Sequence, residues 1–265
     1  MTLLRPSIRL LMRPLRLASL VVLALAGSPS PAFPQSAASA PLQIVITGDS
    51  TVSNYDLKGR DRGWGMFVEE RFKPGTVVVT NLAAPGRSTK TFVSEKRWAK
   101  ALAAKPSYVF IQFGHNDSHD PRNREATDFA SDYKERLRRF IDESRAIGAV
   151  PILVSPMVRR QFDARGKVVD APPPSRPLSA YANAMKEVAL EKKAAFIDLH
   201  ASSRVLVEKM GPEGSAAFAN KKGDATHFNE KGARAMADLV FDGLPSADPK
   251  LASLMLPGAG RSSKK

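Results

Sequence analysis

The chain has 265 residues, no cysteine and a formal net charge of +14 at pH 7. Because cysteine is absent, disulfide bonds, thiolate zinc sites, cysteine nucleophiles and thiol redox motifs are excluded. The positive charge indicates an anionic partner, unless it is only a solvated basic surface.

The first 40 residues have the pattern of a secretory signal peptide. An apolar run, Leu17–Gly27, is followed by the small residues Ser36–Ala40. Four arginines precede this run: Arg5, Arg9, Arg13 and Arg16. The run is shorter than the about 20 residues that span a bilayer. We therefore predict cleavage near residues 38–40 and export to the periplasm or the medium, rather than a retained anchor.

The predicted mature chain is one domain, residues 41–256, followed by a flexible basic tail at 257–265. Loss of the four signal arginines takes the net charge from +14 to +10. No later segment is apolar enough to insert stably into a membrane, and the basic residues are scattered, without an aromatic-rich RNA-binding motif. Together with export, this pattern favours an anionic polysaccharide over nucleic acid as the partner.

After the signal segment, short apolar runs typical of β-strands alternate with segments long enough for helices. The predicted strands are Leu42–Thr47, Val77–Thr80, Tyr108–Phe113, Pro151–Ser155 and Ala195–Leu199. The clearest predicted helices are Ala126–Ile147, Leu178–Lys193 and one following Phe228. Gln161–Pro177 is predicted to be a surface loop, and Asp198 a cap for a helix that starts near His200. This alternation indicates an α/β fold with a central parallel sheet of about five strands.

Residues suited to acyl transfer follow the strands and lie near the C-terminus. Ser50 comes directly after the first strand, and Asp224 and His227 lie three residues apart. A serine hydroxyl is a poor nucleophile, so it needs an imidazole to take its proton and a carboxylate to orient the ring. Gly86 and Asn116 follow the second and third strands and can donate hydrogen bonds to an oxyanion. Without these partners, the turn at Ser50 would be better explained as a helix cap.

These segments resemble the four sequence blocks of the SGNH subfamily of GDSL-type serine hydrolases. Ser50, Gly86, Asn116 and His227 match the block-defining residues, and Asp224 matches the acid. The resemblance implies a flavodoxin-like three-layer α/β/α sandwich. It also implies an oxyanion hole made by the N–H groups of Ser50 and Gly86 and the side chain of Asn116. The Gly-x-Ser-x-Gly elbow of the larger α/β-hydrolases is absent.

Within this family, the chain is most similar to rhamnogalacturonan acetylesterases. The motifs that carry this likeness are Gly48-Asp49-Ser50-Thr51, Gly63-Trp64-Gly65, Gly86-Arg87-Ser88, Phe113-Gly114-His115-Asn116-Asp117 and Thr226-His227. We therefore expect an exported serine esterase that removes acetyl groups from plant cell-wall pectin through an acetyl-enzyme. The alternatives are another carbohydrate O-acetylesterase, a GDSL lipase or esterase, and a noncatalytic carbohydrate-binding protein.

Further side chains are candidates for contact with the substrate. Four of them are basic and follow strand ends: Arg87, Lys90, Arg159 and Arg160. Arginine can hold a uronate carboxylate through paired hydrogen bonds. Trp64 is a candidate pocket wall or a core residue, and His115 is a further candidate. His115, Asp117 and His119 also have metal-site spacing, but serine chemistry needs no metal, so we predict no metal and no cofactor.

Overall fold

The structure is a computed structural model that describes residues 40–260. The signal segment, expected over residues 1–40, lies almost entirely outside the described residues, as do residues 261–265. Within residues 40–260, no helix combines the length and the apolar character needed to span a bilayer.

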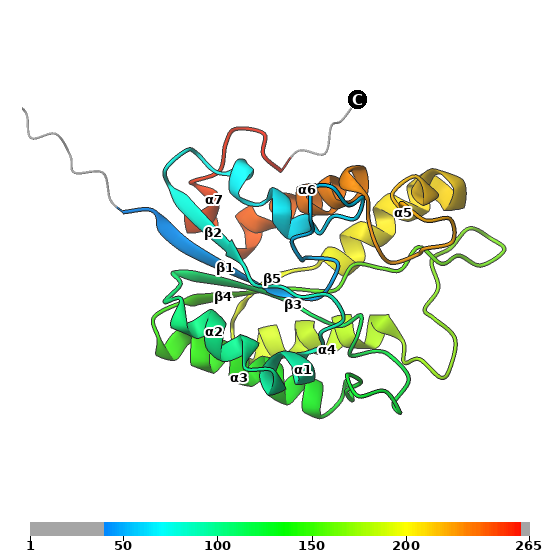
Figure 1. The fold of residues 1–265 in the computed structure, drawn as a ribbon, viewed down its shortest axis with the longest axis horizontal. Coiled ribbons are helices and arrows are strands. Elements are labelled where there is room, and N and C mark those ends of the chain that lie inside the picture. The colour runs from blue at the N-terminus through cyan, green and yellow to red at the C-terminus, as the bar shows by residue number, and fades with distance from the viewer. Residues whose placement is uncertain (1–39, 261–265) are drawn as a thin grey trace, which may run out of the picture. The chain divides into compact units, whose positions relative to one another are not determined.

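A five-stranded sheet, parallel throughout, lies at the centre of the described domain (Figure 1), with the strand order β2-β1-β3-β4-β5. The strands are β1 (Leu42–Gly48), β2 (Val77–Asn81), β3 (Tyr108–Gln112), β4 (Val150–Val154) and β5 (Ala195–Ile197). The expected sheet of about five parallel strands is confirmed, with ends displaced by one or two residues.

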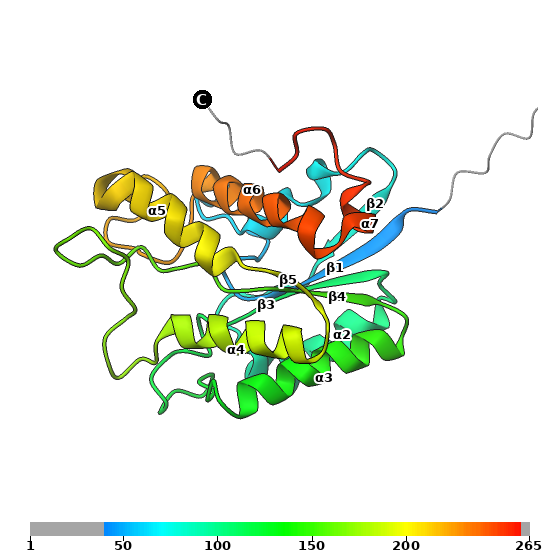
Figure 2. The same cartoon turned by 180° about the vertical axis from the view of Figure 1, so that it is seen from behind.

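Helices cover both faces of this sheet, which confirms the expected three-layer sandwich (Figures 1 and 2). One layer holds α1 (Thr89–Ser94), α2 (Arg97–Ala103), α3 (Asp132–Ala146) and α4 (Leu178–Glu191). The other holds α5 (Leu199–Ala216), α6 (Glu230–Ala247) and α7 (Pro249–Ala252). Two 3-10 turns, Trp64–Phe67 and Glu69–Arg71, follow the loop after β1.

The strands form continuous apolar runs because both faces of the sheet are buried. In β1, Ile44 and Ile46 pack with the layer that contains Phe241 of α6, whereas Val45 packs with the layer that contains Phe140 of α3. Successive side chains of a strand point to opposite faces, so such a strand needs apolar residues at every position.

The order of the strands determines where polar loops meet. From β1 the chain crosses to β2 on one side and then returns to β3 on the other, so the crossover direction reverses around β1. Loops after the carboxyl ends of strands at such a point form the usual ligand crevice of open α/β sheets. Ser50 follows β1, Gly86 follows β2 and Asn116 follows β3.

The helix expected at Ala126–Ile147 begins at Asp132 instead. The Asp128 carboxylate accepts hydrogen bonds from the N–H groups of Ala130 and Ser131, which forms a turn. The carbonyl of Thr127 accepts a hydrogen bond from the hydroxyl of Tyr181. These bonds occupy backbone groups that a first helical turn would use.

Two residues of the tail expected to be flexible at 257–265, Ala259 and Gly260, pack on the domain. Ala259 is buried, and its carbonyl accepts a hydrogen bond of 3.1 Å from Arg71. A Cβ on Gly260 would lie 2.7 Å from the backbone of Phe241, so this glycine is in close contact with α6. The packed domain therefore extends past the predicted boundary at residue 256.

Candidate active site

Ser50 lies in a tight turn directly after β1. Gly48 is required before it, because a Cβ at that position would lie 2.7 Å from the carbonyl oxygen of Gln112. The buried Asp49 carboxylate accepts hydrogen bonds from the N–H group (2.9 Å) and the hydroxyl (2.7 Å) of Thr51. These contacts hold Ser50, which is 7% exposed, at the edge of the sheet.

The structure brings Ser50, His227 and Asp224 into one hydrogen-bonded chain. Oγ of Ser50 lies 3.1 Å from Nε2 of His227, and Nδ1 of His227 lies 3.0 Å from Oδ2 of Asp224. A carboxylate only accepts hydrogen bonds, so the ring carries its proton on Nδ1. Nε2 is then free to accept the proton of the Ser50 hydroxyl.

The environment of Asp224 keeps its carboxylate charged. Partial burial acts to raise its pKa, but hydrogen bonds from the N–H groups of His227 and Thr226 and from the His227 ring outweigh burial and hold the pKa below its usual range. The two backbone bonds, to Oδ1, are 2.9 Å and 2.8 Å long. The three-residue spacing therefore allows one loop to position both the imidazole and the group that orients it.

The Arg160 side chain packs under the loop that carries Asp224 and His227 and is bonded to its backbone. Its Nη2 atom donates to the carbonyl oxygens of Asp224 and His227, each at 2.8 Å, and its backbone N–H donates to Ala225 at 2.8 Å. The guanidinium carbon also lies 4.6 Å from the ring centroid of Phe228. Arg160 was expected as an exposed contact for substrate; instead it is only 8% exposed, and its Nη2 atom is bonded to the loop.

The groups expected to form an oxyanion hole lie on three neighbouring strand ends. Neither the N–H of Ser50 nor that of Gly86 donates a hydrogen bond to any residue between 40 and 260. Nδ2 of Asn116 donates one bond, of 3.1 Å, to the carbonyl of Arg87. Gly86 has a φ of 76°, which favours glycine and exposes its backbone. These N–H groups are available to a bound carbonyl oxygen.

Asp117 joins the segment after Gly86 to the segment of Asn116. It is fully buried, and its Oδ1 accepts hydrogen bonds from the N–H (3.1 Å) and hydroxyl (2.6 Å) of Thr89 and from the hydroxyl of Thr127 (3.0 Å). Burial raises the pKa of Asp117 to about 7, against the lowering effect of these hydrogen bonds. Asp117 therefore has a structural role in fixing two parts of the site.

Trp64 is a core residue and does not form a pocket wall. Its side chain is fully buried, and its Nε1 donates to Oε1 of Gln112 at 2.7 Å. Nε2 of Gln112 donates in turn to the hydroxyl of Thr51 at 2.8 Å. Trp64 thus supports the Ser50 turn through two intermediate side chains. Sequence reasoning missed Gln112, although a glutamine inside an apolar strand is a signal of a buried polar network.

His115 and Arg159 also lie inside the site rather than on its surface. The ring of His115 is buried with Nδ1 3.4 Å from Oδ2 of Asp49, and burial lowers the pKa of His115. Arg159 donates to the carbonyl of His115 at 2.9 Å and to Oγ of Ser118 at 3.3 Å. His115 is therefore a buried ring that faces Asp49 and not a surface contact for substrate.

Arg87 and Lys90, the other two basic candidates, differ in whether the charged group is free to bind a substrate. Arg87 forms an ion pair with Glu95 at 2.9 Å and donates to the carbonyl of Pro85 at 2.8 Å. Lys90 is exposed on the first turn of α1. Of the two, Lys90 is the one whose charge is not already matched by a carboxylate contact within the described residues.

The spacing of His115, Asp117 and His119 does not bring these side chains onto a common point. His119 contacts Oε1 of Glu125 at 2.7 Å, Asp117 is bonded to threonines, and His115 faces Asp49. Within residues 40–260, no group of three or more histidine, aspartate or glutamate side chains is arranged to hold a metal ion.

Known proteins resemble this chain in sequence and in fold. The family model of the GDSL-like lipase/acylhydrolase family matches residues 46–235. The rhamnogalacturonan acetylesterase RhgT of Bacillus subtilis is 37% identical, over 77% of this chain and 90% of its own length.

Two solved structures share the fold. Protein YXIM_BACsu of Bacillus subtilis has a TM-score of 0.66 and 29% identity, and the match covers 78% of this chain and 56% of that one. Axe2, an acetylxylan esterase from Geobacillus stearothermophilus, has a TM-score of 0.61 and 20% identity, covering 76% of this chain and 92% of its own. With the family match over most of the described domain, the chain belongs to the GDSL-like lipase/acylhydrolase family and is a carboxylic ester hydrolase.

Proposed function

We propose that this protein is an exported serine esterase that removes acetyl groups from acetylated rhamnogalacturonan. The observation that carries the proposal is the chain of hydrogen bonds from Ser50 through His227 to Asp224, beside unpaired backbone N–H groups. The relative from Bacillus subtilis, named a rhamnogalacturonan acetylesterase, supports the choice of substrate.

In the first half of the reaction, Oγ of Ser50 attacks the acetyl carbonyl carbon while Nε2 of His227 takes the hydroxyl proton. The carbonyl electrons move to its oxygen, and the N–H groups of Ser50 and Gly86 and the amide of Asn116 stabilise that oxyanion. When the tetrahedral intermediate collapses, the bond to the sugar oxygen breaks. The proton on Nε2 passes to this oxygen, which leaves a free sugar hydroxyl and acetyl-Ser50.

In the second half, water takes the place of the sugar. Nε2 of His227 removes a proton from the water, whose oxygen attacks the acetyl carbon of acetyl-Ser50. Collapse of the second intermediate returns the proton to Oγ of Ser50 and releases acetate. Asp224 keeps its negative charge throughout and stabilises the ring when it is doubly protonated.

The proposal is tested by measuring acetate released from acetylated rhamnogalacturonan and from acetylated xylan, together with hydrolysis of 4-nitrophenyl acetate. We expect turnover of all three, with a higher kcat/KM on rhamnogalacturonan, and loss of turnover in the Ser50→Ala variant. Turnover of a small ester with equal rates on both polymers would favour a general carbohydrate esterase. No turnover of any ester by the folded protein would indicate a binding protein. For export, N-terminal analysis of the secreted protein should find a start near residues 39–41.

A further inference from the structure

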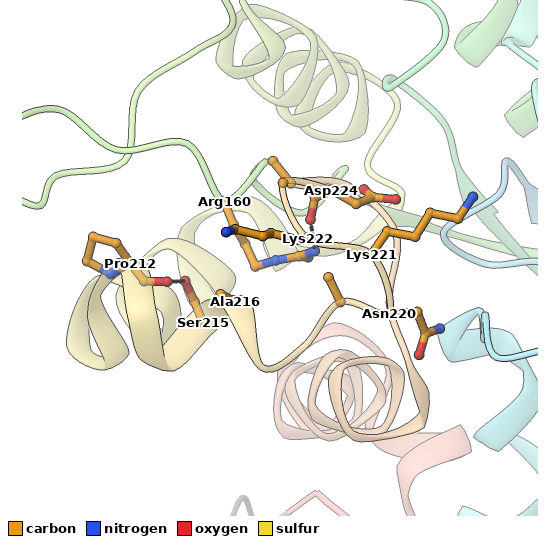
Figure 3. Close-up of a pocket in the computed structure, with 11 residues that line it drawn as sticks. Arg160, Pro212, Ser215, Ala216, Asn220, Lys221, Lys222 and Asp224 are labelled. Atoms are coloured by element: carbon orange, nitrogen blue, oxygen red, sulfur yellow. Dashed lines mark hydrogen bonds between the residues drawn. The ribbon is translucent and has the colours of Figure 1, made fainter.

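A cavity of about 180 Å³ lies beside the loop that carries Asp224 and His227 (Figure 3). It lies between the C-terminal part of α5 and the loop leading to the triad histidine. The residues that line it include Arg160, Pro212, Ser215, Lys221, Lys222 and Asp224. Its volume is below the about 300–1,000 Å³ of pockets for drug-sized ligands, so it suits a single sugar unit rather than an oligosaccharide.

The cavity is lined by cations without carboxylate partners. Within residues 40–260, neither Arg160, Lys221 nor Lys222 forms an ion pair. The carboxylate of Asp224 is already occupied by His227 and by backbone N–H groups. Elsewhere on the described surface, basic side chains such as Arg138 and Arg234 pair directly with glutamates.

Arg160 adds a largely buried charge that forms no ion pair within residues 40–260. Its Nη2 atom donates to neutral carbonyls, whereas its Nε and Nη1 atoms are buried and have no hydrogen-bond partner in the described part of the chain. Burial lowers the pKa of Arg160 to about 10, with Asp224 opposing, so the group stays charged at neutral pH. Burying a charge is costly, and an anion in the adjoining cavity would offset part of that cost in addition to the effect of Asp224.

The side chains of Lys221 and Lys222 point in opposite directions. Figure 3 shows the side chain of Lys222 extending back along Arg160 toward Pro212, while that of Lys221 extends the opposite way. Lys222 is exposed, so its ammonium can reach a group that enters from solvent. The buried Arg160 therefore lies at the bottom of the cavity and the exposed Lys222 at its edge, both beside the loop that carries Asp224 and His227.

We propose that this cavity binds a uronate carboxylate of the polysaccharide whose acetyl group is attacked by Ser50. The inference rests on the proposed function, and it adds the part of the molecule that recognises the anionic chain. Asp224 is bonded to the His227 ring and also lines the cavity, so the cavity adjoins the loop that positions the imidazole. Of the basic side chains predicted from the sequence for this role, Arg160 lines this cavity. Arg87 and Arg159 are bonded elsewhere, and Lys90 is exposed on α1.

Lys222 is the residue to change, because Arg160 also holds the triad loop. The variants are Lys222→Gln, which removes the charge, and Lys222→Glu, which reverses it. The matched control is Lys100→Gln, since Lys100 is also an exposed lysine without an ion pair among residues 40–260 but lies on α2. Each protein is assayed at low salt on acetylated rhamnogalacturonan and on 4-nitrophenyl acetate.

We expect the ratio of kcat/KM on the polymer to kcat/KM on the small ester to fall about fivefold in Lys222→Gln, as for loss of one partly exposed charge contact. The fall should be larger in Lys222→Glu and absent in Lys100→Gln. High salt should reduce the difference between the wild-type protein and Lys222→Gln, because it screens the attraction. In a Ser50→Ala background, Lys222→Gln should weaken binding of a deacetylated rhamnogalacturonan oligosaccharide, but not of a neutral xylo-oligosaccharide.

The outcomes distinguish a failure of the proposed carboxylate-binding cavity, here called the subsite, from a failure of the proposed function. If the wild-type protein prefers acetylated rhamnogalacturonan and Lys222→Gln keeps the wild-type ratio, the subsite is wrong and the proposed function stands. If Lys100→Gln lowers the ratio as much as Lys222→Gln does, general surface charge explains the effect, and the subsite is again wrong. If the wild-type protein does not distinguish rhamnogalacturonan from xylan, the proposed substrate is wrong and the subsite is rejected with it.

Discussion

Replacing Arg160 with methionine should impair the triad without touching it. Methionine retains an apolar stem of similar length, so packing on Phe228 is partly preserved. The change removes the guanidinium donor that bonds to the carbonyls of Asp224 and His227, each at 2.8 Å. Arg160→Lys is an informative companion, because it keeps the charge but lacks the planar arrangement of donors.

The size of the effect follows from those two hydrogen bonds. A hydrogen bond from a charged donor contributes about 1.5–3 kcal/mol. The acceptors are only partly buried, and removal of a largely buried charge returns some energy. We therefore expect a net loss of roughly 2–3 kcal/mol. For a domain of this size, 1 kcal/mol corresponds to about 2–4 °C, so the Tm should fall by roughly 5–10 °C. A displacement of the imidazole by about 1 Å lowers kcat about 10²-fold.

The assay combines thermal unfolding, hydrolysis of 4-nitrophenyl acetate and the rate at which a fluorophosphonate labels Ser50. Labelling reports the alignment of Ser50 with His227 and does not depend on substrate binding, so it should slow in parallel with kcat while KM changes little. Arg145→Met is the matched control, since Arg145 also donates to a backbone carbonyl, that of Lys193, at 3.1 Å. If Arg160→Met kept kcat/KM within about twofold of the wild-type value, the loop would not need this support.

Three other predictions concern the reacting groups and their surroundings. Ser50→Ala and His227→Ala should each remove nearly all activity, and the double variant should lose no more, because the residues act as a unit; additive losses would contradict this. Asn116→Ala should lower kcat by roughly 10²–10³ with a smaller change in KM, because its hydrogen bond strengthens as charge develops on the carbonyl oxygen; an effect on KM alone would make it a ground-state contact. Asp117 has a pKa of about 7 in the fold against an ordinary 3.8, so the native state holds a proton that the unfolded chain releases. The free energy of unfolding, measured by urea denaturation, should therefore fall as pH rises from about 4 to 7, and it should fall less in Asp117→Asn. Equal pH dependence in the wild-type protein and in Asp117→Asn would refute this role of Asp117.

The strands could be predicted because the sheet is buried on both faces, which forces a continuous apolar run in each. Helices were predictable along their length where one face alone is apolar and the segment is long, as in α3, α4 and α6. For α5 only the start was predicted, and it is confirmed, because Asp198 caps the helix by accepting the N–H of Ala201. Farther along, α5 carries Gly211 with a φ of 70° and Pro212, so its pattern is interrupted. α1 and α2 are short and separated by Lys96, which has a φ of 57°. Tertiary packing rather than periodicity stabilises such helices.

The residues expected to react were recognisable because each needs a particular chemistry at a strand end or in the terminal loop. Residues that act through others gave no such signal. An arginine after β4 can point to solvent or under a neighbouring loop, and only the packing of the loop at Asp224 decides that Arg160 lies beneath it. For the same reason, Trp64 could be read as a wall or as core, until its bond to Gln112 placed it under the Ser50 turn.

Three carboxylates belong to the candidate active site, and their surroundings give them different roles. Burial acts to raise the pKa of Asp49, but His115 and Thr51 outweigh it, so Asp49 is ionised and its hydrogen bonds go to its own turn. Burial dominates at Asp117, which is therefore half protonated near pH 7 and ties two loops together. Asp224 alone is both ionised and in contact with the His227 ring. A hydrogen-bond acceptor at Nδ1 fixes the tautomer that leaves Nε2 free, so of these three carboxylates Asp224 is the one placed to orient the imidazole toward Ser50.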